Sequence, residues 1–343
     1  MPDSSADVEG LVDVAAEATL DGVAPAPDAL PDAPTPDAAS DSLGDAYVAD
    51  APLPPYDGPT GVPDPSFGTS GATITPSPID GGSFGQVNAL ALDPDAGTIV
   101  LTGTALLADQ LTWETAVARF TSTGTPDSTF ATNGLLLTNY GLSTQPVGAG
   151  LAVQPDHKLL VAGFGYASLT TNGFYVARLG TTGTLDITFA GSGLLSSSPT
   201  SSSFDGAYPL LLDGTGFYVG GWEGSRNASD FALWRYDLAA APMGSFGSGG
   251  KVTTSIAASK EAHGTAMARQ SSRKVLLAGQ VFDSGASTYD AAIARYTTGG
   301  LLDTTFGTSG LALTGQSGDA AIGGIVVQPD DRIVAVGYST PGT

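Results

Sequence analysis

The chain has 343 residues, with 34 acidic and 12 basic side chains, 47 glycines, 23 prolines and no cysteine. A formal charge of −22 repels phosphate backbones and anionic lipid, which disfavours nucleic-acid binding and polybasic membrane docking. Without cysteine the chain has no disulfide framework, no thiol nucleophile and no Cys-ligated metal site.

The first 63 residues form an acidic, proline-rich tail. They hold 13 acidic residues, no basic residue and 11 of the prolines. Such a segment cannot bury enough apolar surface to offset the conformational entropy of the chain. We therefore predict a disordered tail over 1–63 and a folded array over 64–343. No apolar run approaches the roughly 18 residues of a spanning helix, so we expect no membrane insertion by this chain.

From Asp64 onward a motif, Asp-x-x-Phe-x-x-x-Gly, recurs roughly every 60 residues. Its copies are Asp64, Phe67 and Gly71; Asp127, Phe130 and Gly134; Asp186, Phe189 and Gly193; Phe246 and Gly250, with Met243 in place of the acid; and Asp303, Phe306 and Gly310. This spacing predicts the units 64–126, 127–185, 186–242 and 243–302, followed by a partial unit over 303–343.

Two further landmarks recur within the units. One is an apolar run that ends in glycine, as at 158–163 and 274–279, and the other is an Ala-Arg-aromatic strand, as at 117–120. Pro-Asp turns between apolar runs indicate antiparallel hairpins. Four short strands per unit predict an all-β fold, a β-propeller built of four-stranded antiparallel blades in about five repeats with the last incomplete. A β-solenoid with parallel rungs is the rival interpretation.

Each repeated position has an expected structural role. We expect the phenylalanines to be buried between blades and the glycines to adopt a positive φ or allow close backbone approach. Arg119, Arg178 and Arg295 each precede the acid of the next motif by eight residues, which predicts an Arg–Asp ion pair across the turn that joins two units. Arg235 has the same spacing to Met243, where the acid is missing.

The strings Asp-x-x-Phe-Gly-x-x-Gly, Gln-Pro-Asp and Ala-Arg-Tyr resemble the delta-60 repeat family. Its units are known chiefly from large bacterial surface and secreted proteins and are similar to β-propeller blades. The resemblance covers about 280 residues and is weakest in the third unit, which has Asp213-Gly214 at the Gln-Pro-Asp turn and Met243 for the acid. It implies a repeat scaffold and supplies no catalytic residue. By analogy, an acidic tail before such an array implies an exported or lipoprotein-like protein, extracellular or at a bacterial cell surface. No Ala-Arg-Tyr strand completes the fifth unit, so we expect the C-terminal end to be truncated. Acidic Ala-Pro-Asp spacers commonly follow an export signal, so we expect the same of the N-terminal end.

Few residues suggest chemistry. Acids in the predicted hairpin turns could bind Ca²⁺, although turn capping explains them more simply; they are Asp93, Asp95, Asp156, Asp330 and Asp331. His157 and His263 lie in different units and are interpreted as solvated loop residues. We expect no catalytic residue, no cofactor and no metal.

The leading functional hypothesis is a non-enzymatic, monomeric repeat scaffold or binding module that presents a propeller face to a protein or glycan partner. The alternative is a propeller hydrolase or lyase with its site in the central channel. An enzyme should add acids, histidine or arginine that are unique to one unit. Met243 is instead a loss of an acid, which favours the scaffold.

Overall fold

The computed structural model describes residues 63–73, 85–109, 111–141, 144–168, 171–197, 205–225, 228–256, 259–283, 287–315 and 318–340. The tail predicted over 1–63 lies outside these ranges, apart from Pro63. Within them the chain forms strands and turns, and no helix long and apolar enough to cross a membrane is found there.

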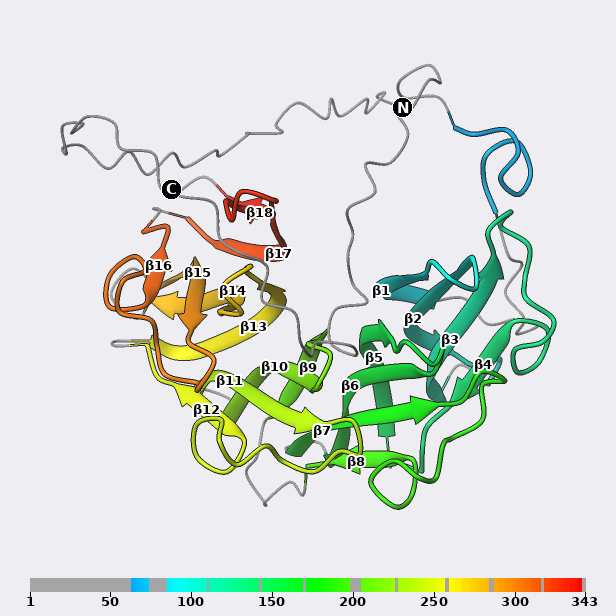
Figure 1. Cartoon of the computed structure of the whole chain (residues 1–343), viewed down its shortest axis with the longest axis horizontal. Coiled ribbons are helices and arrows are strands. Elements are labelled where there is room, and N and C mark those ends of the chain that lie inside the picture. The colour runs from blue at the N-terminus through cyan, green and yellow to red at the C-terminus, as the bar shows by residue number, and fades with distance from the viewer. Residues whose placement is uncertain are drawn as a thin grey trace, which may run out of the picture. The chain divides into compact units, whose positions relative to one another are not determined.

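The strands follow one another along the chain (Figure 1). In order they are β1 (Gly85–Asp93), β2 (Thr98–Leu106), β3 (Trp113–Thr121), β4 (Leu135–Thr138), β5 (Thr144–Val153), β6 (Leu159–Ser168), β7 (Thr171–Leu179), β8 (Leu194–Ser196), β9 (Gly206–Leu212), β10 (Gly216–Ser225), β11 (Ala228–Asp237), β12 (Lys251–Thr254), β13 (Ser259–Arg269), β14 (Val275–Asp283), β15 (Thr288–Tyr296), β16 (Leu311–Leu313), β17 (Ala320–Val327) and β18 (Ile333–Ser339).

These strands build five consecutive antiparallel sheets, which we number in chain order. Sheets 1 to 4 are β1–β4, β5–β8, β9–β12 and β13–β16, and sheet 5 is β17–β18. One parallel bridge, Ser229 to Glu261, connects sheets 3 and 4. The short fourth strand follows the Asp-x-x-Phe loop and pairs backward, as β4 does with β3, so the sheets are offset from the sequence units. An all-β fold of four-stranded antiparallel sheets is thereby confirmed for the described part of the chain.

Close approach of two backbones explains why each apolar run ends in glycine. The first strand of each sheet carries an irregularity in its register opposite this glycine, as between Gly264 and Ala266 in sheet 4. A Cβ atom on Gly279 would lie 1.9 Å from the carbonyl oxygen of His263. Only glycine allows the two backbones to approach this closely, and the bulge redirects the start of the first strand.

The core lies between consecutive sheets. Four apolar clusters follow one another: the first joins sheets 1 and 2, the next sheets 2 and 3, then sheets 3 and 4, and the last sheets 4 and 5. The first strands β1, β5, β9, β13 and β17 also contact each other in this order. Stability therefore depends on contacts between neighbouring sheets, as expected of a repeat array.

Candidate functional site

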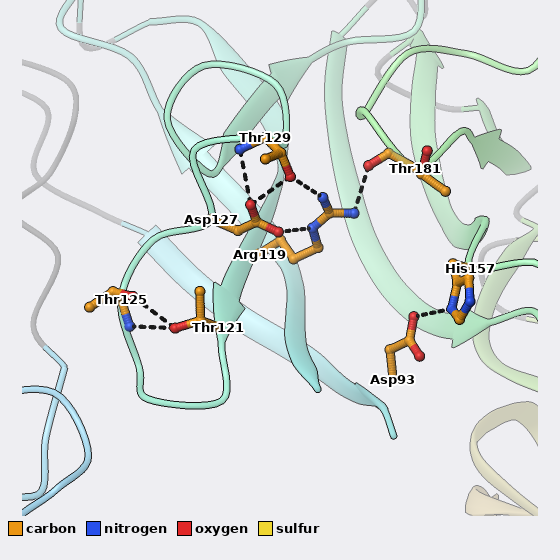
Figure 2. Close-up of polar contacts among 8 residues, drawn as sticks. All are labelled: Asp93, Arg119, Thr121, Thr125, Asp127, Thr129, His157 and Thr181. Carbon is orange, nitrogen blue, oxygen red and sulfur yellow. Dashed lines mark hydrogen bonds and ion pairs between the residues drawn. The ribbon is translucent and has the colours of Figure 1, made fainter. Parts of the chain in front are cut away.

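Arg119 connects the turn of its own sheet to the next sheet (Figure 2). Arg119 lies on β3. Its Nε donates a hydrogen bond to Asp127 Oδ2 at 2.8 Å, and its Nη2 donates one to Thr129 Oγ1 at 3.0 Å. Its Nη1 donates to the carbonyl oxygen of Thr181, in the turn after β7, at 2.7 Å. Asp127 in turn accepts the backbone N–H and the hydroxyl of Thr129. One guanidinium thus holds two sheets together.

The Arg–Asp contact recurs in sheets 2 and 4, and the contact with the next turn recurs in sheet 2. Arg178 Nε donates to Asp186 at 2.9 Å and its Nη1 donates to the carbonyl oxygen of Leu238 in the next turn. Arg295 Nε donates to Asp303 at 2.8 Å, and Lys274 Nζ lies 2.8 Å from the same carboxylate. The lysine and threonine hydrogen bonds and the arginine charge lower the pKa of Asp303 well below its usual range. The three Arg–Asp pairs spaced eight residues apart are therefore ion pairs.

Sheet 3 uses a different acid. Arg235 has Met243 at the usual spacing, and its Nη2 instead lies 2.5 Å from Oδ2 of Asp213 in the β9–β10 turn. Burial acts to raise the pKa of Asp213, but hydrogen bonds from Thr215 and the Arg235 charge outweigh it and lower that pKa. The third unit keeps its ion pair through the residue that departs from the Gln-Pro-Asp pattern.

The repeated phenylalanines seal the contact between sheets. Phe130, Phe189 and Phe246 are 0% exposed, whereas Phe67 and Phe306, at the two ends of the array, are only partly buried. The Arg119 guanidinium carbon lies 4.7 Å from the centre of the Phe130 ring, a cation–π distance. We call the packing of each Asp-x-x-Phe loop on the turn of the following sheet a joint.

The acidic hairpin turns considered for Ca²⁺ contact protein groups. Asp93 accepts the Ala96 N–H and lies 2.8 Å from Nδ1 of His157 in the equivalent turn of the next sheet (Figure 2). Asp156 pairs with Lys158, Asp330 pairs with Arg332, and Asp331 accepts a hydrogen bond from the Ser271 hydroxyl. Among the described residues no group of three or more metal-ligating side chains is found.

The opposite end of sheet 3 carries a group of charged residues that the sequence analysis overlooked. Asp205 directly precedes β9, and Glu223 is near the end of β10, so antiparallel pairing places both away from the Asp213 turn. Lys251 Nζ lies 2.8 Å from Glu223 Oε1, and the Thr253 hydroxyl donates to Glu223 Oε2 at 3.1 Å. We call these four residues the acidic cluster.

Among the four-stranded sheets, the ion pair of Glu223 and Lys251 is specific to sheet 3. Strand pairing aligns Lys251 with Leu135, Leu194 and Leu311 of the other sheets. The same registers align Glu223 with Ala105, Gly165 and Val281. A cation and an anion have therefore been gained where the other sheets hold apolar or small residues. The expectation that the units differ from the repeat pattern only by losing charged residues is wrong. It rested on the motif positions and not on every position that strand pairing aligns.

Asp205 has unusual electrostatics for an acid in this chain. It is 8% exposed, and its carboxylate accepts the Gly224 N–H at 3.2 Å. Burial raises its pKa, the Gly224 N–H and the Lys251 charge oppose the rise, and the negative charge of Glu223 adds to it. Burial thus favours the protonated form of Asp205 beside the carboxylate of Glu223, which is ion-paired with Lys251, and two carboxyl groups in such different surroundings can act as acid and base.

Aromatic rings from three sheets meet near the start of β9. Trp222 packs over the start of β9, where a Cβ on Gly206 would lie 2.2 Å from its ring. The Tyr208 ring centre is 5.3 Å from that of Trp222 and 5.5 Å from that of Phe164 in sheet 2. Trp222 also stands 4.4 Å from the His263 ring of sheet 4. Trp222 is buried, whereas Phe164 and Tyr208 are partly exposed and offer apolar faces.

His263 and Glu261 continue this end into sheet 4. His263 lies on β13 with its side chain 17% exposed, so its interpretation as a solvated loop residue is wrong. Its Nε2 lies 3.3 Å from Glu261 Oε1, and the Tyr289 hydroxyl donates to Glu261 Oε2 at 3.1 Å. Burial lowers the pKa of His263, and this effect outweighs the Glu261 charge, which acts to raise the same pKa.

The residues predicted from the sequence and those that the sequence analysis overlooked thus lie in different parts of the fold. The Asp, Arg, Phe and Gly positions of the repeat meet at the joints and hold the sheets together. Asp205, Glu223, Lys251 and His263 gather at the other end of sheets 3 and 4. Aligning the units at the repeated glycine and searching for charged residues in apolar columns would have found them.

One protein-family model, described as a β-propeller, matches parts of the chain. The model for "Domain of unknown function (DUF5122) beta-propeller" matches residues 97–130, 154–189 and 270–306. These segments run through sheets 1, 2 and 4 and leave out the corresponding part of sheet 3, which carries Asp213, Glu223 and Met243. The expected resemblance to a repeat β-propeller family is supported at this level. No curated protein matches the chain.

Among solved structures, the chain is similar to sucrose-6-phosphate hydrolase from Lactobacillus gasseri, with 10% identity and a TM-score of 0.41, over 74% of this chain and 54% of that one. It is also similar to an engineered GH43 glycoside hydrolase, with 11% identity and a TM-score of 0.34, over 65% and 40% of the two chains. A third is MPT-4, a mannose phosphorylase from Leishmania mexicana, with 13% identity and a TM-score of 0.36, over 78% and 82%. The chain spans about half the length of the first two.

These neighbours stand against the expectation of a non-enzymatic scaffold or binding module, because all three are enzymes. We therefore do not retain that expectation. At such low identities and TM-scores they assign neither a substrate nor a catalytic residue to this chain, and any site must be argued from its own side chains.

Proposed function

We propose that the chain is a hydrolase that cleaves glycosidic bonds of a neutral glycan at the acidic cluster. One observation carries the proposal. Asp205 is a buried acid with a raised pKa next to Glu223, and Glu223 is ion-paired with Lys251. Glycoside hydrolysis generally needs one carboxyl group that is protonated and a second that is ionised.

The roles follow from the surroundings of each acid. Burial favours the protonated form of Asp205, whose proton passes to the departing oxygen of the substrate as the glycosidic bond breaks. Glu223, held by Lys251 and the Thr253 hydroxyl, accepts a proton from the water molecule that attacks the sugar carbon. The Glu223 and Lys251 side chains are about one third exposed, at 31% and 39%, which leaves this side of the cluster open to a substrate.

Two features favour a neutral sugar as the substrate class. The partly exposed rings of Phe164 and Tyr208 offer flat apolar faces on which the C–H faces of a sugar ring can stack. The formal charge of −22 repels polyanionic substrates. The exported or surface location expected from the tail suits a polysaccharide substrate and stays a prediction.

The test uses a panel of 4-nitrophenyl glycosides together with release of reducing ends from neutral polysaccharides. We expect the Asp205→Asn and Glu223→Gln variants each to lose about 10²- to 10⁴-fold in turnover, the usual effect of removing a general acid or base. Asp95→Asn removes an exposed turn acid at the other end of sheet 1 and should leave turnover unchanged. The proposal fails if the wild-type chain turns over no substrate faster than the Asp205→Asn variant does.

A further inference from the structure

Strand pairing brings Glu261 of sheet 4 close to the acidic cluster of sheet 3. Ser229, near the start of β11, pairs with Gly224 of β10 on one side and forms the parallel bridge to Glu261 of β13 on the other. Neighbouring strands lie about 4.8 Å apart, so the backbone of Glu261 is about 10 Å from that of Gly224. Gly224 follows Glu223 in the chain, and its N–H donates to Asp205. A ligand longer than one sugar ring that is bound at the acidic cluster can therefore reach Glu261.

A row of contacting rings also runs from sheet 3 to sheet 4. The Tyr208 ring contacts Trp222, and Trp222 contacts His263 on β13. His263 Nε2 in turn lies 3.3 Å from Glu261 Oε1. These contacts hold Glu261 in a fixed position relative to sheet 3, as a preorganised binding residue requires.

The Glu261 carboxylate is oriented by its neighbours and can still accept further hydrogen bonds. The Tyr289 hydroxyl donates to its Oε2 at 3.1 Å, while Oε1 faces His263. Burial and the Glu261 charge raise the pKa of Tyr289, so the hydroxyl keeps the proton that it donates. A carboxylate has about four lone-pair positions, which is more than these two contacts use. The Glu261 side chain is 23% exposed, so a ligand can reach the remaining positions.

An aromatic ring accompanies this carboxylate. Phe282 on β14 is paired with Tyr289 on β15, and their ring centres lie 5.2 Å apart in an edge-to-face arrangement. Both side chains are partly exposed. An apolar ring can stack on the C–H groups of a neutral sugar, and an oriented carboxylate can accept hydrogen bonds from its hydroxyl groups. Sheet 4 thus offers both kinds of contact at one place.

We propose that Glu261, Tyr289 and Phe282 form a second sugar-binding subsite, so that the substrate is an oligosaccharide or polysaccharide extending from sheet 3 to sheet 4. This subsite rests on the proposed hydrolase function, because it binds another part of the same substrate. The bond that is cleaved lies at Asp205 and Glu223, and a unit farther along the sugar chain binds at Glu261. Losing Glu261 should therefore weaken the binding of long substrates more than that of short ones.

The first test measures binding separately from turnover, in the full chain carrying Asp205→Asn. The probes are neutral cello-, manno- and xylo-oligosaccharides of two to six units, titrated by calorimetry. We expect the affinity to rise with length in at least one series. Adding Glu261→Gln should weaken the binding of its longest members by about tenfold, the effect of losing one hydrogen bond to a charged group, and leave its two-unit member almost unchanged. An equal loss at every length, or no binding by any member, would overturn the inference.

Two further variants distinguish a subsite from a structural role. Tyr289→Phe keeps the ring and removes the hydroxyl that orients Glu261, so it should weaken the binding of long members by less than Glu261→Gln does. Glu114→Gln removes an acid at the same end of sheet 1 and should leave the whole series unchanged. The urea midpoint is measured for each variant. If the Glu261→Gln variant loses stability and binds every member less well, Glu261 is a structural residue and the inference is wrong.

Values of kcat/KM for the same probes separate this inference from the hydrolase proposal. If the chain cleaves the probes and Glu261→Gln lowers kcat/KM equally for short and long ones, the hydrolase proposal stands and the subsite is wrong. If the chain cleaves none of them but binds the long ones through Glu261, the hydrolase proposal is wrong and the subsite stands as a glycan-binding site.

Discussion

The two ends of sheet 3 use carboxylates in opposite ways. At the β9–β10 turn, the Asp213 side chain is 4% exposed, and its contacts with Thr215 and Arg235 outweigh burial and lower its pKa. At the other end Asp205 is also buried, but burial and the Glu223 charge raise its pKa. The first acid is stabilised as an anion and holds the fold, whereas the second is stabilised as a neutral acid. The comparison shows that the partner of a buried acid, rather than burial itself, separates a structural acid from a candidate reactive one.

The joints are where substitutions should have the largest effect on folding. Phe189→Ala removes a ring that is 0% exposed between sheets 2 and 3 and should lower the free energy of unfolding by about 3–5 kcal/mol. Phe67→Ala removes the equivalent ring at the start of the array, which is partly exposed, and should cost less. Urea denaturation measures both, and equal losses would contradict the role of the following sheet in burying the ring.

Removing the arginine of a joint should lower the free energy of unfolding less than removing its phenylalanine does. Arg178→Ala deletes hydrogen bonds to Asp186, Thr188 and the Leu238 carbonyl, and the loss of hydrogen bonds to a charged group should cost about 1.5–3 kcal/mol. Arg332→Ala is the control, because this side chain is 78% exposed in its pair with Asp330 and its removal should leave the free energy of unfolding almost unchanged. If the two variants unfold at the same urea concentration, the joints do not depend on arginine.

Much of the joint chemistry was predictable from the sequence. The spacing of eight residues between Arg119 and Asp127 recurs from Arg178 to Asp186 and from Arg295 to Asp303, and a fixed spacing across a turn is a local property of the chain. The replacement of the fourth acid by Asp213 was not predictable in this way, because Asp213 lies on a different hairpin from Arg235 and reaches it only through strand pairing.

The acidic cluster was missed for a related reason. Lys251 and Glu223 come from strands that are separated by β11, and they meet only when the sheet register is known. The raised pKa of Asp205 depends on its burial in the folded chain and on the Glu223 charge, which no sequence pattern encodes. The register also shows that these charges belong to sheet 3 alone.

The two classes of acid affect the pH dependence of folding stability in opposite directions. An acid whose pKa is lowered on folding, such as Asp186, stabilises the fold above its unfolded pKa, and that stability is lost as the pH falls toward the folded pKa. For Asp205, whose pKa is raised, the folded state holds the proton more tightly. Its contribution is therefore present below the unfolded pKa and is lost as the pH rises through the folded pKa.

The most direct test of this account is a site-resolved ¹³C NMR titration of the Asp205 and Asp186 carboxyl groups in the folded chain, with Asp205→Asn used to assign the first signal. The account predicts that Asp205 titrates above the ordinary aspartate value of about 3.9 and that Asp186 titrates below it. A pKa for Asp205 at or below the ordinary value would contradict the central claim, because it would then be a structural acid like those at the joints.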